Sequence, residues 1–170
     1  ASSGAWNAGG MYLFPGSLGR DSPISAIGDV NSDGRSDTLV TFSSAGFQTA
    51  AHLILGNSDP DSATSVALNI PTDLGFLVLS GDGGQDVNGD GAADFVLSGY
   101  QFNGGIRTGV AVYFGCVDEN DCNIGELTTA DAVITVPNSV MVNVSMVGNF
   151  NQRAIDGANQ IADLLIGGLS

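Results

Sequence analysis

A nine-residue acidic segment occurs twice in the chain with nearly the same sequence. The first acidic loop, Asp29–Asp37, reads DVNSDGRSD, and the second acidic loop, Asp86–Asp94, reads DVNGDGAAD. Each loop is followed by an apolar run, Thr38–Phe42 or Phe95–Leu97. Because a repeated segment indicates a repeated structural unit, we expect the chain to fold as tandem copies of one supersecondary motif.

Further apolar runs follow each loop in the same order. Short apolar or alternating runs bounded by turn residues are typical of strands. The candidates are Ala51–Gly56 and Val66–Ile70, Val110–Gly115 and Ala132–Val136, and, in a weaker third copy, Val142–Gly148 and Ala162–Gly168. The best helical candidate, Ala154–Ala162, is short. We therefore predict an all-β protein with little or no helix and about four short antiparallel strands per repeat.

The charge of the chain is strongly negative. Its 170 residues include 18 acidic and 4 basic ones, which gives a net charge of −14, and lysine is absent. All the acids except Glu119 and Glu126 are aspartate, a residue that favours turns and hard-cation sites over helices. Nucleic acids and anionic membranes attract basic surfaces, and no apolar run approaches the ~18 residues of a membrane span. We therefore expect neither nucleic-acid binding nor membrane insertion.

The spacing of oxygen-bearing residues predicts a calcium site in each loop. Calcium takes six to eight oxygens, and a tight turn supplies them from alternate residues, with a glycine at its sixth position. Magnesium suits such a loop less, because it keeps more of its waters. An EF-hand would also need a glutamate where Val40 and Leu97 stand, so the site closes at position 9 instead. The predicted ligands are Asp29, Asn31, Asp33, the carbonyl of Arg35 and Asp37, and in the second loop Asp86, Asn88, Asp90, the carbonyl of Ala92 and Asp94.

Two alternatives qualify this prediction. The loops are also compatible with metal-free turns rich in Asp, Asn and Gly, although three carboxylates in one short turn repel each other without a cation. A third loop is degenerate, because its candidate ligands are more widely spaced and carry fewer charges. They are Asn149, Asn151, Asp156 and Asp163, and we expect binding there to be weak or absent.

Three other features bear on compartment and chemistry. Cys116 and Cys122 lie close together in an acidic, loop-like segment, which favours a small disulfide-closed loop over two free thiols. A disulfide implies an oxidising compartment. Asn143 begins a glycosylation sequon. His52, the only histidine, lies within an apolar strand candidate, so we expect a structural role and assign no catalytic residue.

The two acidic loops, each followed by an apolar strand, resemble the FG-GAP repeats of integrin-α-like (VCBS-type) β-propellers. The resemblance implies that each loop joins the first two strands of a propeller blade and holds one calcium ion. It divides a single 1–170 domain into blades at about 20–70, 74–137 and 139–170. Closed propellers have four or more blades, so this ring is expected to be incomplete or completed by oligomerisation. A strand within 9–15, Gly10–Pro15, is a candidate to complete the third blade.

The resemblance also suggests a function outside the cell. It implies a secreted or cell-surface, calcium-binding and non-catalytic module for adhesion or for surface or filament assembly. The expected partner is a protein or glycan at the cell surface, or another copy of the chain that pairs through exposed strand edges. The alternatives are an accessory propeller fragment of a secreted carbohydrate-active enzyme and a calcium-dependent lectin.

Overall fold

The computed structural model describes residues 24–43, 49–59, 62–71, 77–101, 107–137, 141–148 and 162–169. Its strands are β1 (Ile24–Gly28), β2 (Asp37–Ser43), β3 (Thr49–Leu55), β4 (Thr64–Ala67), β5 (Leu77–Gln85), β6 (Asp94–Gln101), β7 (Arg107–Tyr113), β8 (Ala132–Pro137), β9 (Met141–Val147) and β10 (Asp163–Leu169). A 3-10 helix, Glu119–Asp121, and a one-turn α-helix, α1 (Ile124–Leu127), lie between β7 and β8. None of the described helices is long and apolar enough to cross a membrane.

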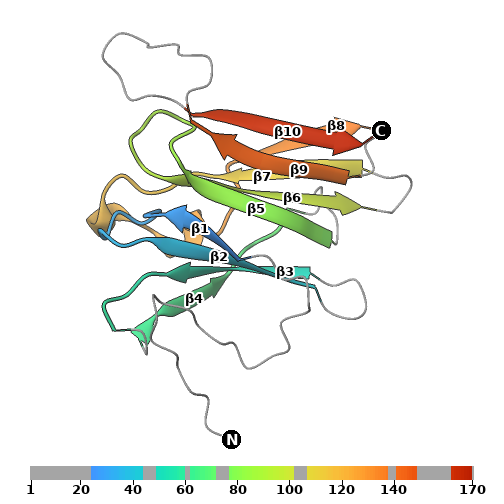
Figure 1. Ribbon diagram of the computed structural model, residues 1–170. Coiled ribbons are helices and arrows are strands. Elements are labelled where there is room, and N and C mark those ends of the chain that lie inside the picture. Colours follow the sequence, from blue (N-terminus) through green and yellow to red (C-terminus); the bar gives the residue numbers. More distant parts are fainter. Residues whose placement is uncertain are drawn as a thin grey trace, which may run out of the picture.

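The strands form three separate antiparallel sheets, which lie one above another in Figure 1. Two sheets have four strands each, in the orders β1-β2-β3-β4 and β5-β6-β7-β8, and the third is the hairpin β9-β10. The prediction of a mostly β chain is confirmed, and the described strands form no closed ring. The strand candidate Gly10–Pro15 and nearly all of the helical candidate Ala154–Ala162 lie outside the described residues.

The two four-stranded sheets repeat the same register at their acidic loops. In the first sheet, Gly28 pairs with Asp37 after a bulge, and in the second, Gln85 pairs with Asp94 after a bulge at the same place. A bulge adds one residue to one strand and increases its local twist, so it re-aims the turn that follows. Both acidic loops therefore leave their sheets in the same way, and Figure 1 shows both turns on the same side of the molecule.

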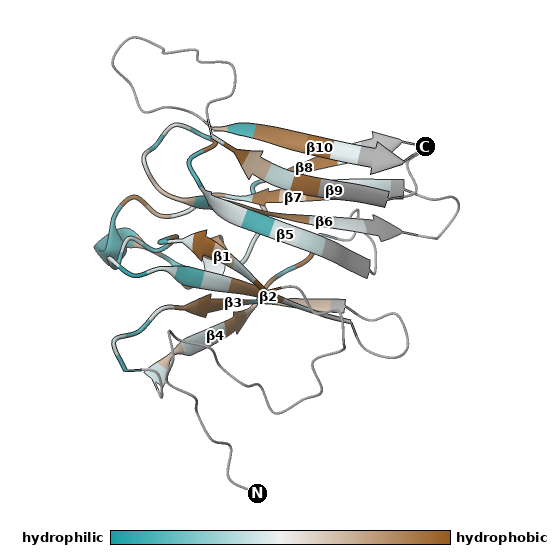
Figure 2. Ribbon diagram, viewed as in Figure 1, coloured by the Kyte–Doolittle hydropathy of each residue, from teal (hydrophilic) through white to brown (hydrophobic). Residues whose placement is uncertain are grey.

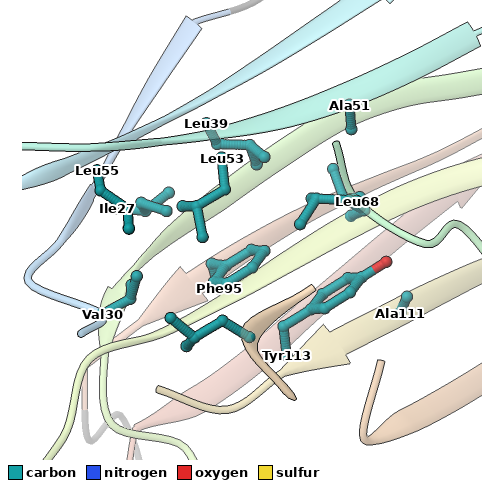
Figure 3. Packing of buried hydrophobic residues seen from close by; sticks show 12 residues of the cluster. Ile27, Val30, Leu39, Ala51, Leu53, Leu55, Leu68, Phe95, Ala111 and Tyr113 are labelled. Atoms are coloured by element: carbon teal, nitrogen blue, oxygen red, sulfur yellow. The ribbon is translucent and has the colours of Figure 1, made fainter. Parts of the chain in front are cut away.

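The main core lies between the two four-stranded sheets. Leu39 and Leu53 of the first sheet face Phe95 and Tyr113 of the second in Figure 3, and all four are buried. The rings of Phe95 and Tyr113 stack with centroids 4.7 Å apart. Burying such side chains contributes roughly 1.5–3 kcal/mol each, so this layer fixes how the two sheets sit together. In Figure 2, much of β3 and β10 carries hydrophobic colour, whereas the turn between β1 and β2 is hydrophilic.

The strands that precede the acidic loops, β1 and β5, were expected from the resemblance, but no apolar pattern in the sequence predicted their bounds. Strand β5 contains the glycine-rich stretch Ser80–Gln85, and glycine weakens a strand unless another chain segment must come close. The structure supplies that reason, because a Cβ atom at Gly83 would lie 2.7 Å from Ile27, and one at Gly81 would overlap Leu39. The glycines therefore let β5 pack directly on the first sheet.

Strand β5 also contacts the third sheet, because it lies between β1 and β9. On one side, the Ser25 hydroxyl donates a hydrogen bond of 2.7 Å to the carbonyl of Gly81. On the other side, one carboxylate oxygen of Asp82 accepts bonds from the Ser145 hydroxyl at 2.8 Å and from the Met146 main-chain N–H at 3.0 Å. The three sheets are thus linked in series through their first strands.

Candidate metal-binding loops

The first acidic loop is held by its own carboxylates. Asp29 accepts hydrogen bonds from the main-chain N–H groups of Asp33 and Gly34, at 3.1 and 2.8 Å. Asp33 accepts one from the N–H of Arg35 at 2.8 Å. The amide nitrogen of Asn31 donates to the Asp33 carboxylate, and its oxygen accepts from the Asp33 N–H. The side chains at positions 1, 3 and 5 therefore gather around a single turn.

The second acidic loop repeats this arrangement. Asp86 accepts bonds from the N–H groups of Gly89 and Gly91, at 2.6 and 2.8 Å. Asp90 accepts from the N–H of Ala92 at 2.8 Å, and Asn88 donates to its carboxylate at 2.7 Å. The main difference is that Asp86 reaches the N–H of residue 89, whereas Asp29 reaches that of residue 33, one position further along the turn.

The glycines at position 6 behave as the sequence predicts. Gly34 and Gly91 have φ angles of 82° and 99°, in the left-handed region that side chains with a Cβ atom disfavour. This conformation turns the chain sharply enough for the N–H of the glycine to return to the position-1 carboxylate. The predicted turn residue is therefore confirmed in both loops.

The aspartates at position 9 link each loop to a more distant strand. One carboxylate oxygen of Asp37 accepts a 2.8 Å bond from the N–H of Val30, and the other accepts a 2.8 Å bond from the N–H of Gly56, just after β3. Asp94 contacts the N–H groups of Val87 and Gly115 in the same way, at 2.7 and 2.9 Å. These residues thus connect three chain segments, a role that sequence reasoning did not predict for them.

Burial sets the electrostatics of both position-9 carboxylates. Asp37 and Asp94 are only 1% and 0% exposed. Loss of solvation raises the pKa of each carboxylate to about 6, although two main-chain hydrogen bonds lower the pKa. The nearby charges of Asp33 and Asp29, or of Asp90 and Asp86, raise it further. The carboxylates of each loop are therefore close enough to repel one another, as the sequence suggests.

A nearby basic side chain distinguishes the two loops. The guanidinium of Arg35 lies 3.7 Å from the Asp33 carboxylate, with 46% of the Arg35 side chain exposed. Position 7 of the second loop is Ala92, which is buried. In the described part of the chain, no basic group pairs with the carboxylates of the second loop. The negative charge of the first loop is thus partly compensated, whereas no described basic side chain compensates that of the second.

The predicted disulfide is present and lies against the first loop. Cys116 and Cys122 are bonded, which confirms the pairing expected from their spacing. The N–H of Cys116 donates a 2.8 Å bond to the carbonyl of Val30, and the hydroxyl of Ser32 donates a 2.6 Å bond to the carbonyl of Cys116. Sequence reasoning could not place this contact, because the residues come from different repeats and no local pattern connects them.

The oxygen-bearing side chains of the loops are suitable ligands for a hard cation, but their present arrangement does not form a complete metal site. Among the described residues, no three His, Cys, Asp or Glu side chains are arranged so that they could hold a metal ion. The reason is visible in the bonds above, since each carboxylate is directed at main-chain N–H groups. An ionised carboxylate offers about four acceptor positions, however, and most of the loop oxygens use one. The donor set therefore suits a hard cation, provided that the side chains rotate to meet it.

The third predicted site lies mostly outside the described residues. Asn149, Asn151 and Asp156 lie outside the described residues, and only Asp163, the first residue of β10, is placed. The residue before it contacts the second loop, because the N–H of Ala162 donates a 2.6 Å bond to the carbonyl of Asp86. The start of β10 therefore packs against position 1 of that loop.

His52, expected to be structural, is half-buried on β3, where its Nδ1 lies 3.1 Å from the hydroxyl of Ser65.

No family model matches the chain, and no curated protein is significantly similar to it. The resemblance of the loops to a known repeat therefore depends on their own sequence.

Proposed function

We propose that this chain is an extracellular, non-catalytic module of the FG-GAP repeat type that binds calcium through its two acidic loops. In this proposal, Asp29, Asn31, Asp33 and the carbonyl of Arg35 hold one ion together with Asp37. The equivalent residues of the second loop hold another. The role of the ion is to brace the ends of the strands, so that the module presents a rigid surface for adhesion or assembly.

One observation carries the calcium proposal, namely that two loops far apart in the chain share both their sequence and their internal hydrogen bonds. Two like charges 4 Å apart near a protein surface repel by about 4 kcal/mol. Three carboxylates in one turn therefore oppose folding. The pKa of Asp37 is raised mainly by burial, and the neighbouring charges of Asp33 and Asp29 raise it further. A divalent cation would reverse the sign of this interaction and add its binding energy to the stability of the fold.

The position-9 aspartates explain how such an ion would stiffen more than its own turn. Asp37 is bonded to the turn through Val30 and to the end of β3 through Gly56. An ion held by Asp37 would therefore fix the β1–β2 turn relative to β3, and one held by Asp94 would fix the β5–β6 turn relative to β7. A location outside the cell is supported by the disulfide, which is typical of oxidising compartments.

The assembly role is supported by the unequal sizes of the sheets. The third sheet has two described strands, whereas the other two have four each. Strand β10 is therefore an edge strand in the described part of the chain, and its Leu165 is 61% exposed. An apolar edge of this kind favours the addition of another strand. We propose that the segment Gly10–Pro15, from the same or a neighbouring copy, supplies it.

Calorimetric titration with calcium tests the binding proposal. Asp33→Ala and Asp90→Ala should each reduce the number of bound ions by one, whereas Glu119→Ala, which removes an exposed charge outside the loops, should leave it unchanged. At a free calcium concentration about 100-fold above Kd, each site should stabilise the fold by about 2.7 kcal/mol, so the melting temperature should rise by roughly 10 °C or more over that in chelator. Identical melting curves in calcium and chelator would refute the proposal.

A further inference from the structure

Strand β8 is an edge of the second sheet that resembles a docking site for an added strand. It is hydrogen-bonded to β7 alone among the described strands, which leaves its outer row of main-chain N–H and C=O groups unpaired by any of them. Residues 132–135 are all exposed, including Val133 and Ile134, which point to opposite faces of the strand. An added strand would therefore find both main-chain partners and apolar side chains.

This edge also lacks the features that usually block strand addition. Proteins protect their edges with lysine, inward-pointing charges, bulges or proline. The register between β7 and β8 is continuous over six pairs, without a bulge. The strand sequence AVITVP is uncharged, and its proline is the last residue. Within the described part of the chain, the edge is therefore unprotected over residues 132–135.

An acidic pocket adjoins the beginning of this edge. A cavity of about 290 Å³ lies in the connection between β7 and β8, and Asp118, Asp121, Glu126 and Asp131 are among the residues that line it. Asp131 is the residue directly before β8, and its carboxylate accepts a 2.8 Å bond from the N–H of Phe114. The pocket therefore lies at the end of the second sheet where β8 begins.

The walls of the pocket indicate which side chain would enter it. Phe114 and Leu127 offer apolar surface, and the four acids offer negative charge. Lysine and arginine side chains complement both surfaces, because they have an apolar stem and a cationic end. The chain itself has no lysine, and one of its four arginines, Arg35, is already paired with Asp33. Charge complementarity therefore points to a different protein and not to a second acidic copy.

We propose that β8 binds an extended segment of a partner protein as an added antiparallel strand, with a lysine or arginine of that segment in the acidic pocket. In an antiparallel arrangement, the C-terminal end of the added strand lies beside the start of β8. The basic residue is therefore expected near the C-terminal end of the recognised segment. The inference uses residues outside both acidic loops, so it does not depend on calcium binding.

A pair of synthetic peptides tests this inference. Both alternate threonine and valine and are amidated at the C-terminus, and they differ only in their last side chain, which is lysine or norleucine. The lysine peptide should bind roughly tenfold more tightly, as expected for one charge-assisted contact. Its binding should shift the NMR signals of the β8 amides both in calcium and in EDTA. Peptide binding is therefore tested independently of calcium binding.

Two matched variants locate the basic residue. Glu126→Gln, in the pocket, should weaken the lysine peptide several-fold and leave the norleucine peptide unaffected. Glu119→Gln makes the same chemical change on a neighbouring exposed residue outside the pocket and should alter neither. Equal affinity for the two peptides, no binding of either, or equal effects of the two variants would overturn the inference. So would a concentration-dependent dimer in which β8 amides are protected without peptide, because the occupant would then be a second copy.

Discussion

The hydroxyl of Ser32 donates a 2.6 Å hydrogen bond to the carbonyl of Cys116, which ties the first acidic loop to the disulfide-closed turn of the next sheet. A second bond, from the N–H of Cys116 to the carbonyl of Val30, runs in the opposite direction. The first loop is therefore positioned partly by a covalent cross-link that lies in another repeat. The second loop lacks the hydroxyl bond, since glycine occupies the place of Ser32 at position 89. Among the described residues, it contacts the following sheet through the N–H of Ala162, without a disulfide.

This relationship predicts that the disulfide supports calcium binding at the first loop only. Replacing both cysteines by alanine should free the turn that holds Val30 and Ser32, and Ser32→Gly should remove one bond without straining the left-handed conformation at that position, where φ is 58°. Loss of one hydrogen bond corresponds to about 1 kcal/mol, or roughly fivefold in affinity. Calorimetry in an Asp90→Ala background measures the first loop alone.

The matched measurement uses an Asp33→Ala background, in which only the second loop binds. The cysteine and serine changes should leave its affinity unaltered. An equal loss at both loops would show that the cysteine changes act through general destabilisation and not through the contact with Ser32.

A second prediction concerns the buried carboxylate of Asp37. Asparagine has nearly the same shape, but one of its two polar groups is a donor and would face a main-chain N–H. Asp37→Asn should therefore leave the N–H of Val30 or Gly56 unsatisfied and destabilise the apo protein by about 1–3 kcal/mol. Urea unfolding in chelator measures this change. Glu119→Gln, on the surface, should change the free energy of unfolding by less than about 0.5 kcal/mol.

A third prediction concerns pH. Because the pKa of Asp37 and of Asp94 rises from 3.8 to about 6 on folding, the folded state holds more protons than the unfolded state between these values. The contribution of these groups to stability is therefore fully present below pH 3.8 and is lost as the pH rises through about 6. Calcium should oppose this loss, since it favours the ionised carboxylates.

The test compares the wild type with Asp37→Asn, because the difference between the two isolates the contribution of Asp37 from that of the other carboxylates. The free energy of unfolding of the wild type in chelator should fall more steeply between pH 4.5 and 6.5 than that of Asp37→Asn, which cannot titrate at this position. Parallel pH profiles for the two proteins would contradict the assignment of the raised pKa to Asp37.

The sequence predicted those features of the fold that depend on residues close together in the chain. The turn glycines, the strands after each loop and the pairing of Cys116 with Cys122 all depend on residues close together in the chain. The bounds of the strand before the second loop could not be predicted, because β5 owes its glycines to close packing on Ile27 and Leu39 of another sheet. A propensity argument counts those glycines against a strand.

The candidate site divides in the same way. The residues at positions 1, 3 and 5 meet within one turn, so their grouping could be predicted from spacing. The roles of Gly56 and Gly115 could not, since the N–H of each donates to an aspartate at the start of an earlier strand. Their glycine identity is nevertheless explained by the structure, because a Cβ atom at either position would collide with the main chain beside the loop, at Ser36 or Ala93.

The last prediction concerns Asp82, which links the third sheet to the second. Its carboxylate accepts bonds from the Ser145 hydroxyl and the Met146 N–H of β9, and a charged acceptor of this kind contributes about 1.5–3 kcal/mol per bond. Asp82→Ala should therefore loosen the β9–β10 hairpin and speed hydrogen exchange of its amides by roughly tenfold or more, while amides of β2 and β3 keep their wild-type rates. Ser25→Ala is the matched control, because it removes the corresponding bond to Gly81 between the first and second sheets and leaves the β9 contact intact. If Asp82→Ala accelerated exchange equally in all three sheets, the carboxylate would be supporting the whole fold and not the docking of one hairpin.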